Sequence, residues 1–266
     1  MQRSGVVYTM GFAAAVCAVC SVVVATSAVV LKDKQDFNAR LDKQKKILSV
    51  SGLVDESQKI NAKDAVAMFD ERIRTRVVDL KTSEFAGDEQ AILDSGYDQH
   101  KAASEKETSI EAPANTAQVA RIPDYAFVYE VLDENNEVQR VVLPVEGKGL
   151  WSTLYGYIAL EKDLNTIAGL TFYKHGETPG LGGEVDNPRW KGLWPGRQAY
   201  DDDGAVKIRV IKGAAGTPEE APYSVDGLSG ATITSNGVSH LLEFWLGESG
   251  FGPFLKNYRQ QLAGGA

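Results

Sequence analysis

The first segment of the chain is marked by an uninterrupted apolar run. No charged residue occurs from Val6 to Leu31, a stretch of 26 consecutive positions. About 20 apolar residues are enough for a helix to cross the hydrocarbon core of a bilayer. We therefore expect a single transmembrane helix within residues 1–35, which would anchor the rest of the chain.

A cleaved signal peptide is the alternative interpretation of this run. Signal peptides usually have an apolar core of about 7 to 15 residues before a small-residue cleavage site, so the longer run favours an uncleaved anchor. Both cysteines, Cys17 and Cys20, lie within it. Their C-x-x-C spacing can serve redox or metal chemistry, but because the span offers no further ligand we interpret them as small apolar residues.

The charges beside the anchor predict a cytoplasmic location for the large domain. Lys and Arg near a membrane helix favour the cytoplasmic side, whereas Asp and Glu count little. Arg3 precedes the apolar run, and six basic residues follow it: Lys32, Lys34, Arg40, Lys43, Lys45 and Lys46.

Residues 36–120 are predicted to form a helical stalk and a polar linker. Apolar residues at roughly helical spacing continue a helix from Lys32 to Gly52, which is a suitable stop. A second helix is predicted over residues 62–78. From residue 85 to 119 the sequence turns polar, which indicates a linker or short helices with little core.

Residues 121–266 are predicted to form one α+β domain, with a largely antiparallel sheet and flanking helices. The polar tetrapeptide ENNE joins the first two strands and is suited to a hairpin. The strands are expected at 126–133, 138–147, 153–160, 166–173 and 206–213. A closing helix that ends near Gly247 is indicated by four apolar residues at helical spacing: Val238, Leu241, Leu242 and Trp245.

Composition narrows the classes of function. The 266 residues are 43% hydrophobic, which is enough for a core of ordinary size, and the net charge of −8 argues against a nucleic-acid partner. The part after the anchor has no cysteine, so neither a disulfide framework nor a thiolate cluster is expected. The three histidines, His100, His175 and His240, are too scattered to suggest a metal site.

A glycine-rich loop spans residues 174–194. Within it, Thr178 to Gly180 fits a type II turn. The loop can be an ordinary surface turn, or its bare backbone can let a flat ligand approach and bond ring carbonyls. It does not match the nucleotide fingerprint G-x-G-x-x-G. Three tryptophans nearby could stack on a planar cofactor or fill the core: Trp151, Trp190 and Trp194.

The stretch DGLSGATITSNGV, residues 226–238, gathers four hydroxyl side chains and three glycines before the closing helix. Thr234 or Ser235 is a natural N-cap for that helix. The small residues before it lie where unpaired amides and the helix dipole favour an anion such as phosphate. The residues alone therefore predict a phosphate-bearing ligand near Thr232.

The segment DGLSGAT resembles the covalent flavinylation motif D-x-x-[S/T]-G-A-T, in which a flavin transferase joins FMN through its phosphate to the last threonine. The chain as a whole is similar to the C subunit of the sodium-pumping NADH:quinone oxidoreductase, on the basis of the anchor, the KKILSVSGL stalk, the HGETPGLGG loop and the SGATITSNGV helix start. Two alternatives remain: the G subunit of the related ferredoxin-linked complex, and an anchored extracytoplasmic binding module without redox chemistry.

The resemblance implies roles for particular residues. Thr232 would carry the FMN phosphoester, within a recognition segment of Asp226, Ser229, Gly230 and Ala231. The isoalloxazine ring would lie against Glu177, Thr178, Leu181 and Gly182. Trp151 is a further candidate contact, and Lys212 would offset phosphate charge or be an ordinary solvated lysine.

The resemblance further implies electron relay rather than substrate turnover, so no catalytic residue is assigned. The complex passes electrons from NADH to ubiquinone and exports sodium, and the chain's partners would be its other subunits and, during maturation, the flavin transferase. The family's transferase works outside the cytoplasm. This implies a single-pass protein of the bacterial inner membrane with a periplasmic FMN domain, in conflict with the lysine count.

Overall fold

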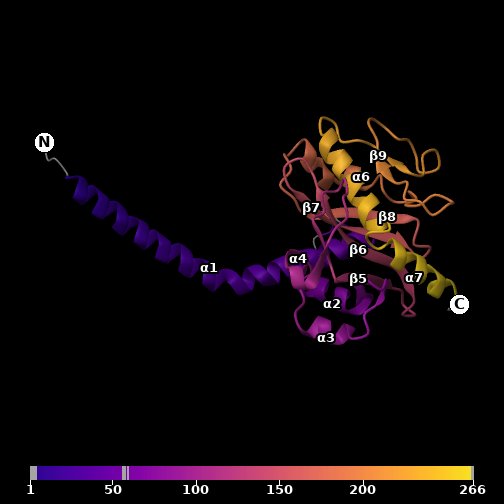
Figure 1. Ribbon diagram of the computed structural model, residues 1–266, viewed down its shortest axis with the longest axis horizontal. Helices are drawn as coiled ribbons and strands as arrows, with labels where there is room; N and C mark the ends of the chain where they lie inside the picture. Colours follow the sequence, from indigo (N-terminus) through magenta and orange to yellow (C-terminus); the bar gives the residue numbers. More distant parts are fainter. Residues whose placement is uncertain (1–4, 56–57, 59, 265–266) are drawn as a thin grey trace. The chain divides into compact units, whose positions relative to one another are not determined.

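A computed structural model describes residues 5–55, 58 and 60–264, which fall into two units, Met1–Lys43 and Gln44–Ala266. Helix α1, Val6–Val50, is continuous through the predicted anchor and the start of the stalk (Figure 1). Within the described residues it is the one helix long and apolar enough to cross a membrane. Gly52 ends this segment with a φ of 74°, a conformation that favours glycine.

A six-stranded antiparallel sheet forms the framework of the second unit, which confirms the predicted α+β class. Its strand order is β2-β1-β5-β6-β7-β8. The four strands predicted between residues 126 and 173 are all present, with the hairpin at ENNE. The bounds are β1 Ile73–Asp79, β2 Glu84–Phe85, β5 Tyr125–Leu132, β6 Val138–Lys148, β7 Thr153–Glu161 and β8 Ile167–Lys174.

The helix predicted over residues 62–78 was wrong for residues 73–78. Helix α2, Ala62–Arg72, begins after Asn61, whose side chain accepts the Asp64 N–H, and it gives way to β1 at Ile73. All seven residues of β1 pair with β5, and this tertiary pairing overrides the local helical pattern. The sheet thus draws β1, the strand beside β5, from the stretch assigned to stalk and linker.

The polar stretch at 85–119 contains short elements rather than one long linker. These are α3 Glu89–Asp94, α4 Gln99–Ser104, the 3₁₀ turn η1 Lys106–Thr108 and β3 Ser109–Glu111, which pairs with β4 Arg121–Pro123. Asp98 caps α4 by accepting the N–H groups of His100 and Lys101.

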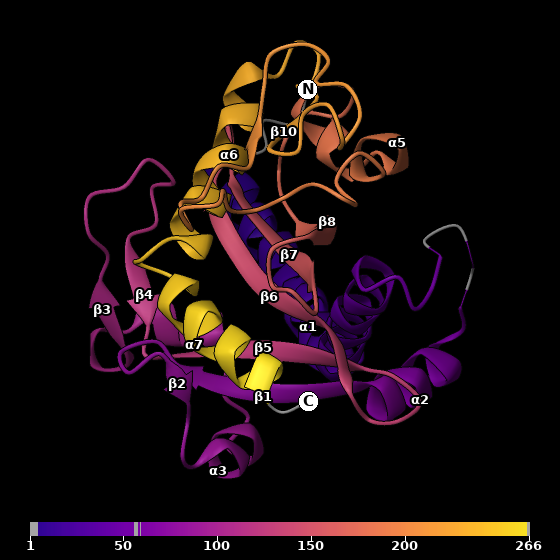
Figure 2. The same cartoon turned by 90° about the vertical axis from the view of Figure 1, so that its right-hand side faces the viewer.

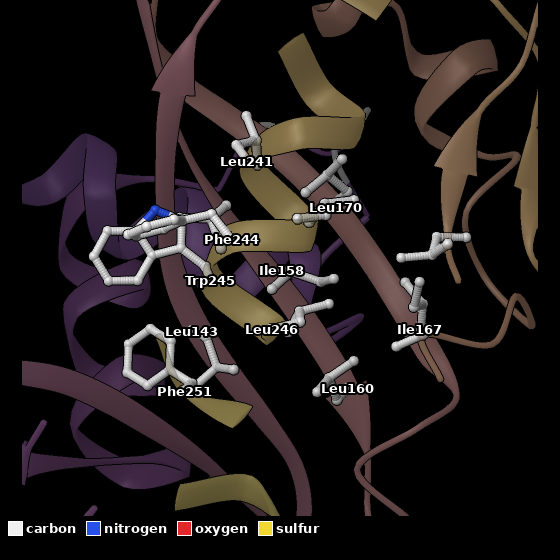
Figure 3. Close-up of a cluster of buried hydrophobic side chains, with 14 of the residues drawn as sticks. Leu143, Ile158, Leu160, Ile167, Leu170, Leu241, Phe244, Trp245, Leu246 and Phe251 are labelled. Atoms are coloured by element: carbon white, nitrogen blue, oxygen red, sulfur yellow. The ribbon is translucent and has the colours of Figure 1, made fainter. Parts of the chain in front are cut away.

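Two C-terminal helices cover one face of the sheet. Helix α6, Thr232–Leu246, packs on β6, and α7, Gly252–Gly264, lies beside β5 and β1 (Figure 2). The core between α6 and the sheet includes Leu143, Ile158, Leu241 and Trp245, all at most 1% exposed (Figure 3). The Trp245 indole N–H donates to the Glu146 carbonyl at 2.7 Å. The predicted closing helix is therefore confirmed, and it fixes the position of the segment that precedes it.

Residues 175–231 form a loop-rich layer between β8 and α6. It contains η2 Gly182–Asp186, α5 Pro188–Lys191 and a two-stranded parallel ribbon of β9 Arg209–Val210 and β10 Ser224–Val225. The strand predicted at 206–213 is thus reduced to two residues. The Val210 N–H donates to Ser239 Oγ on α6, so part of this backbone pairs with a helix side chain instead of a strand.

Buried Arg197 holds this layer together. Its side chain is 1% exposed, and its guanidinium donates to the carbonyls of Leu193, Gly216, Thr217 and Ala221 at 2.6–3.1 Å. Because a buried guanidinium is costly unless its donors are satisfied, this arrangement fixes the loop that precedes β10.

Candidate functional site

Glu177 joins three segments around the start of α6. Its side chain is 5% exposed, and its carboxylate accepts a hydrogen bond from Thr234 Oγ1 at 2.6 Å. It also accepts the backbone N–H groups of three consecutive residues after β6, Leu150, Trp151 and Ser152, at 3.0–3.1 Å. Glu177 therefore connects the glycine-rich loop, the β6–β7 turn and α6.

The charge on Glu177 is stabilised by this arrangement. Burial alone would raise the pKa of its carboxyl, but the hydrogen bonds from Thr234 and from the amides of residues 150–152 outweigh burial and hold the pKa below its ordinary value. Two glycines leave room for it: a Cβ on Gly149 would lie 2.7 Å from Oε1, and one on Gly182 would lie 2.7 Å from Oε2.

Helix α6 begins earlier than its hydroxyls predicted. Its first residue is Thr232 and its N-cap is Ala231, so the predicted N-cap role of Thr234 or Ser235 was wrong. Both hydroxyls are buried and have other partners. Thr234 donates to Glu177, and Ser235 Oγ accepts the Leu228 N–H at 3.0 Å.

The predicted attachment residue lies at the surface. Thr232 is exposed and occupies the first turn of α6. The first amides of a helix have no intrahelical acceptor and, with the helix dipole, favour a negatively charged group. Exposed Lys212 belongs to the neighbouring loop, where the Gly213 carbonyl accepts the Gly227 N–H at 2.9 Å. The surroundings of Thr232 thus suit an anion.

Four exposed apolar side chains belong to the segments that meet around Thr232, and we call them the site rim: Leu150 (43% exposed), Trp151 (67%), Leu181 (46%) and Ile233 (58%). A Cβ on Gly230 would lie 3.0 Å from Leu181 Cδ2, so Leu181 reaches the predicted recognition segment. Exposed apolar side chains gathered from separate segments indicate a binding surface. The rim suits one side of a planar aromatic ring.

The sequence predicted two of the rim residues, Trp151 and Leu181, and missed Leu150 and Ile233. A signal for Ile233 was available. The buried face of α6 runs through Thr234, Val238 and Leu241 at helical spacing, and Ile233 lies off that face. An apolar residue on the polar side of a helix, next to the predicted attachment residue, points to a ligand or partner.

The glycine-rich loop adopts the predicted turn. Gly180 has a φ of 76° and the Leu181 N–H donates to the Thr178 carbonyl, as a type II turn requires. Thr178 is exposed, whereas Gly182 is buried against Thr234 and Glu177. Trp190 and Trp194 are buried core residues, in edge-to-face contact with each other.

The fold and this site place the chain among proteins with an FMN-binding domain, a family that residues 149–247 match. The chain belongs to the NqrC family, the C subunits of the Na(+)-translocating NADH-quinone reductase. It is 47% identical to the NqrC of Pseudomonas aeruginosa over 95% of both chains, and 46% identical to that of Vibrio alginolyticus over 94% of both.

Solved structures agree with this assignment. The crystal structure of NqrC from Shewanella oneidensis matches with a TM-score of 0.75 and 36% identity, covering 85% of this chain and 99% of that one. The corresponding protein from Parabacteroides distasonis matches with a TM-score of 0.61 and 28% identity, covering 85% of this chain and 96% of that one. The resemblance seen in the sequence is confirmed, and the family is that of the sodium-translocating complex.

Proposed function

We propose that this chain carries FMN as a phosphoester on the Thr232 hydroxyl and serves as an electron carrier in a membrane complex. The observation that carries the proposal is the exposed hydroxyl of Thr232 at the start of α6, inside the motif DGLSGAT. The first amides of α6 are available to a phosphate, and the apolar site rim is available to a flat ring. These features fit FMN, which has one charged end and one planar end.

In this proposal the ring lies over the site rim, against Trp151 and Leu181, with Leu150 and Ile233 as additional contacts. Exposed Thr178 lies at the edge of the ring. Glu177 and Gly182 are buried below the rim. The Glu177 carboxylate accepts hydrogen bonds from protein donors, and these bonds order the loops that carry the rim. Lys212 offsets the charge of the phosphate.

The FMN supplies one- and two-electron redox chemistry, while the protein sets the polarity and position of the ring. The relatives are named as subunits of a Na(+)-translocating NADH-quinone reductase. We infer that this chain works in the same kind of assembly, which couples NADH oxidation and ubiquinone reduction to sodium export. A covalent tether suits a carrier that exchanges electrons with partner subunits and never dissociates.

We place the chain in the bacterial inner membrane, with α1 as its single span and the FMN domain in the periplasm. The basic residues after the anchor argue for the opposite orientation, but packing against partner helices can override the positive-inside tendency. C-terminal reporter fusions test the orientation. Activity of a reporter that works only in the cytoplasm would contradict the periplasmic placement.

Complementation tests the function. Membranes from cells that lack this protein are expected to regain sodium-dependent NADH oxidation when they receive the wild-type chain and a flavin transferase. Thr232→Ala should restore assembly of the complex, checked by copurification of its subunits, without restoring that activity. Full activity of Thr232→Ala would exclude the proposed role of Thr232 as the site of an essential flavin.

A further inference from the structure

Strand β1 has one edge that is left open along most of its length. The strand lies between β5 and β2 in the sheet. All residues of Ile73–Asp79 pair with β5, but only the last two pair with β2 (Figure 2). On the side of β2, residues 73–77 therefore form an edge of the sheet.

The hydrogen bonds of Val77 show which backbone groups face this edge. Its carbonyl accepts the Ala86 N–H at 2.9 Å, and its N–H lies 3.4 Å from Glu89 Oε1, so both groups point away from β5. Because the direction alternates along an antiparallel strand, the N–H and carbonyl of Thr75 point the same way. Neither group has a hydrogen-bond partner among the residues that the structure describes. Thr75 thus presents an unpaired donor and an unpaired acceptor at the edge.

A groove of about 480 Å³ runs beside this edge. Residues 74–76 of β1 form one wall, and residues 86–91 with Leu93, which include the start of α3, form the other. Thr75 is half-buried, and the side chain of Arg74 is 46% exposed. An extended polypeptide in the groove would therefore reach the backbone of Thr75.

We propose that an extended segment of a partner subunit adds to the sheet at this edge by pairing with the backbone of Thr75. In strand addition, main-chain hydrogen bonds supply affinity, and alternate side chains of the added strand supply specificity. The inference rests on the proposed assembly with other subunits, but it does not depend on flavin attachment at Thr232.

The charges beside Thr75 indicate the chemistry of the added segment. Arg76 is engaged by Glu89 at 2.8 Å. Arg74 contacts Glu130 through Nε at 2.6 Å, yet its side chain stays 46% exposed at the edge. Opposite charges on paired strands stabilise the pairing, and a guanidinium binds carboxylates through several N–H groups. The added segment therefore carries an acidic side chain opposite Arg74.

A second copy of this chain does not suit the edge. If two β1 edges paired antiparallel around Thr75, Arg74 of each copy would lie directly opposite Arg76 of the other. Like charges in that position destabilise a pair of strands. Glu89 also occupies the Val77 N–H, in the way that charged side chains protect strand edges. These contacts oppose self-association and leave Thr75 as the open position.

Hydrogen exchange of the Thr75 amide tests the proposal without any substitution. Overlapping peptides resolve this amide in the purified full chain in detergent and in the purified assembly of subunits. Its exchange is expected to slow by at least about tenfold in the assembly, because a paired amide exchanges only when the pairing opens. The Arg76 amide, which faces β5, is the internal reference and should exchange slowly in both samples.

Two substitutions at Thr75 separate the backbone donor from the side chain. Thr75→Pro removes the outward N–H, and an edge strand tolerates proline where the N–H does not pair with a neighbour. Recovery of the other subunits with the tagged chain should fall by about tenfold, since the interface leaves an acceptor unsatisfied. Thr75→Ala keeps the N–H and is the matched control, with recovery near the wild-type level.

Thermal unfolding and flavin content of the isolated chain are measured for both variants and should match the wild type, which separates lost docking from lost folding. Arg74→Gln tests the acidic partner residue and should lower recovery, whereas Arg74→Lys keeps the charge and should lower it less. Equal recovery in these two variants would contradict the acidic residue opposite Arg74.

The outcomes distinguish this inference from the proposed function. An equal exchange rate of the Thr75 amide in the isolated chain and in the assembly would overturn strand addition, as would normal recovery with Thr75→Pro. Protection that grows with the concentration of the isolated chain would identify a second copy as the occupant and overturn the partner assignment. If the wild-type chain recovers no other subunit, the proposed assembly fails and strand addition fails with it.

Discussion

Thr234 Oγ1 donates to Glu177 Oε2 at 2.6 Å, between two buried side chains that are 57 residues apart in the chain. This hydrogen bond ties the first turn of α6 to the glycine-rich loop. The same carboxylate accepts the amides of Leu150, Trp151 and Ser152, so one buried charge orders all the segments that carry the site rim.

The first prediction concerns the loss of this hydrogen bond. Thr234→Ala leaves a buried carboxylate oxygen without its hydroxyl donor, and hydrogen bonds to charged groups contribute about 1.5–3 kcal/mol. We expect the free energy of unfolding to fall by about that amount in urea titrations. Thr234→Ser keeps the donor and should lose clearly less.

Exposed Thr116 offers the matched control, because Thr116→Ala makes the same chemical change at the surface. Its free energy of unfolding should stay within about 0.5 kcal/mol of the wild type. Equal losses in Thr116→Ala and Thr234→Ala would show that the contact with Glu177 contributes nothing specific.

The second prediction follows from the lowered pKa of Glu177. A carboxyl whose pKa is lower in the folded state stabilises the fold above its unfolded pKa of about 4.3, and that contribution is lost as the pH falls through the folded pKa. The stability difference between wild type and Glu177→Gln should therefore be constant from pH 7 to about pH 5 and shrink below about pH 4.3. A difference that persists undiminished to pH 3 would contradict the assignment.

The third prediction concerns the close approach of α6 to β6. A Cβ on Gly237 would lie 2.4 Å from the Lys148 carbonyl oxygen. Gly237→Ala gains about 1 kcal/mol of helix propensity, but it forces the helix away from the strand, so we expect a net loss of stability on denaturation. Gly87→Ala, where an added Cβ meets no atom within 4 Å, should show no such loss.

The fourth prediction tests whether the site rim is the binding surface for the flavin ring. Leu181→Glu places a negative charge beside the ring and should lower the reduction potential of the bound flavin by about 20–60 mV, because the added electron is repelled. Ile110→Glu is the matched control, since Ile110 is 45% exposed and Leu181 46%, and Ile110 lies on β3. Potentials are measured per bound flavin by spectroelectrochemistry. The same shift in both variants would mean that the rim does not face the ring.

The fold was predictable where local pattern and tertiary environment agree. The strands from Tyr125 to Lys174 have β-branched and aromatic residues, and the closing helix has a clear apolar face. The pattern predicts helix for residues 73–78 because Ile73 continues the apolar spacing of α2. Only the pairing of this segment with β5, about 50 residues away, makes it a strand, and single-sequence periodicity carries no information on such a partner.

The candidate site could be predicted where a hydroxyl belongs to a sequence motif. It could not be predicted where the tertiary fold determines the hydrogen-bond partners. Thr234 and Ser235 are residue types that N-caps prefer, but α6 begins at Thr232. Both hydroxyls form tertiary hydrogen bonds instead, with Glu177 and with the Leu228 N–H. The hydrogen bonds that Glu177 accepts could not be derived from sequence spacing, because their donors lie in segments distant along the chain. Asp226 was assigned to recognition, and its contact with Ala215 became visible only in the fold.

Covalent attachment at Thr232 is tested most directly by peptide mass spectrometry. The full chain is coexpressed with a flavin transferase, denatured, separated from free flavin and digested. The account predicts that the peptide containing Thr232 carries the added mass of FMN, and that Thr232→Ala yields a denatured chain without flavin fluorescence. A denatured wild-type chain without flavin, or FMN on another residue while Thr232 stays unmodified, would contradict it.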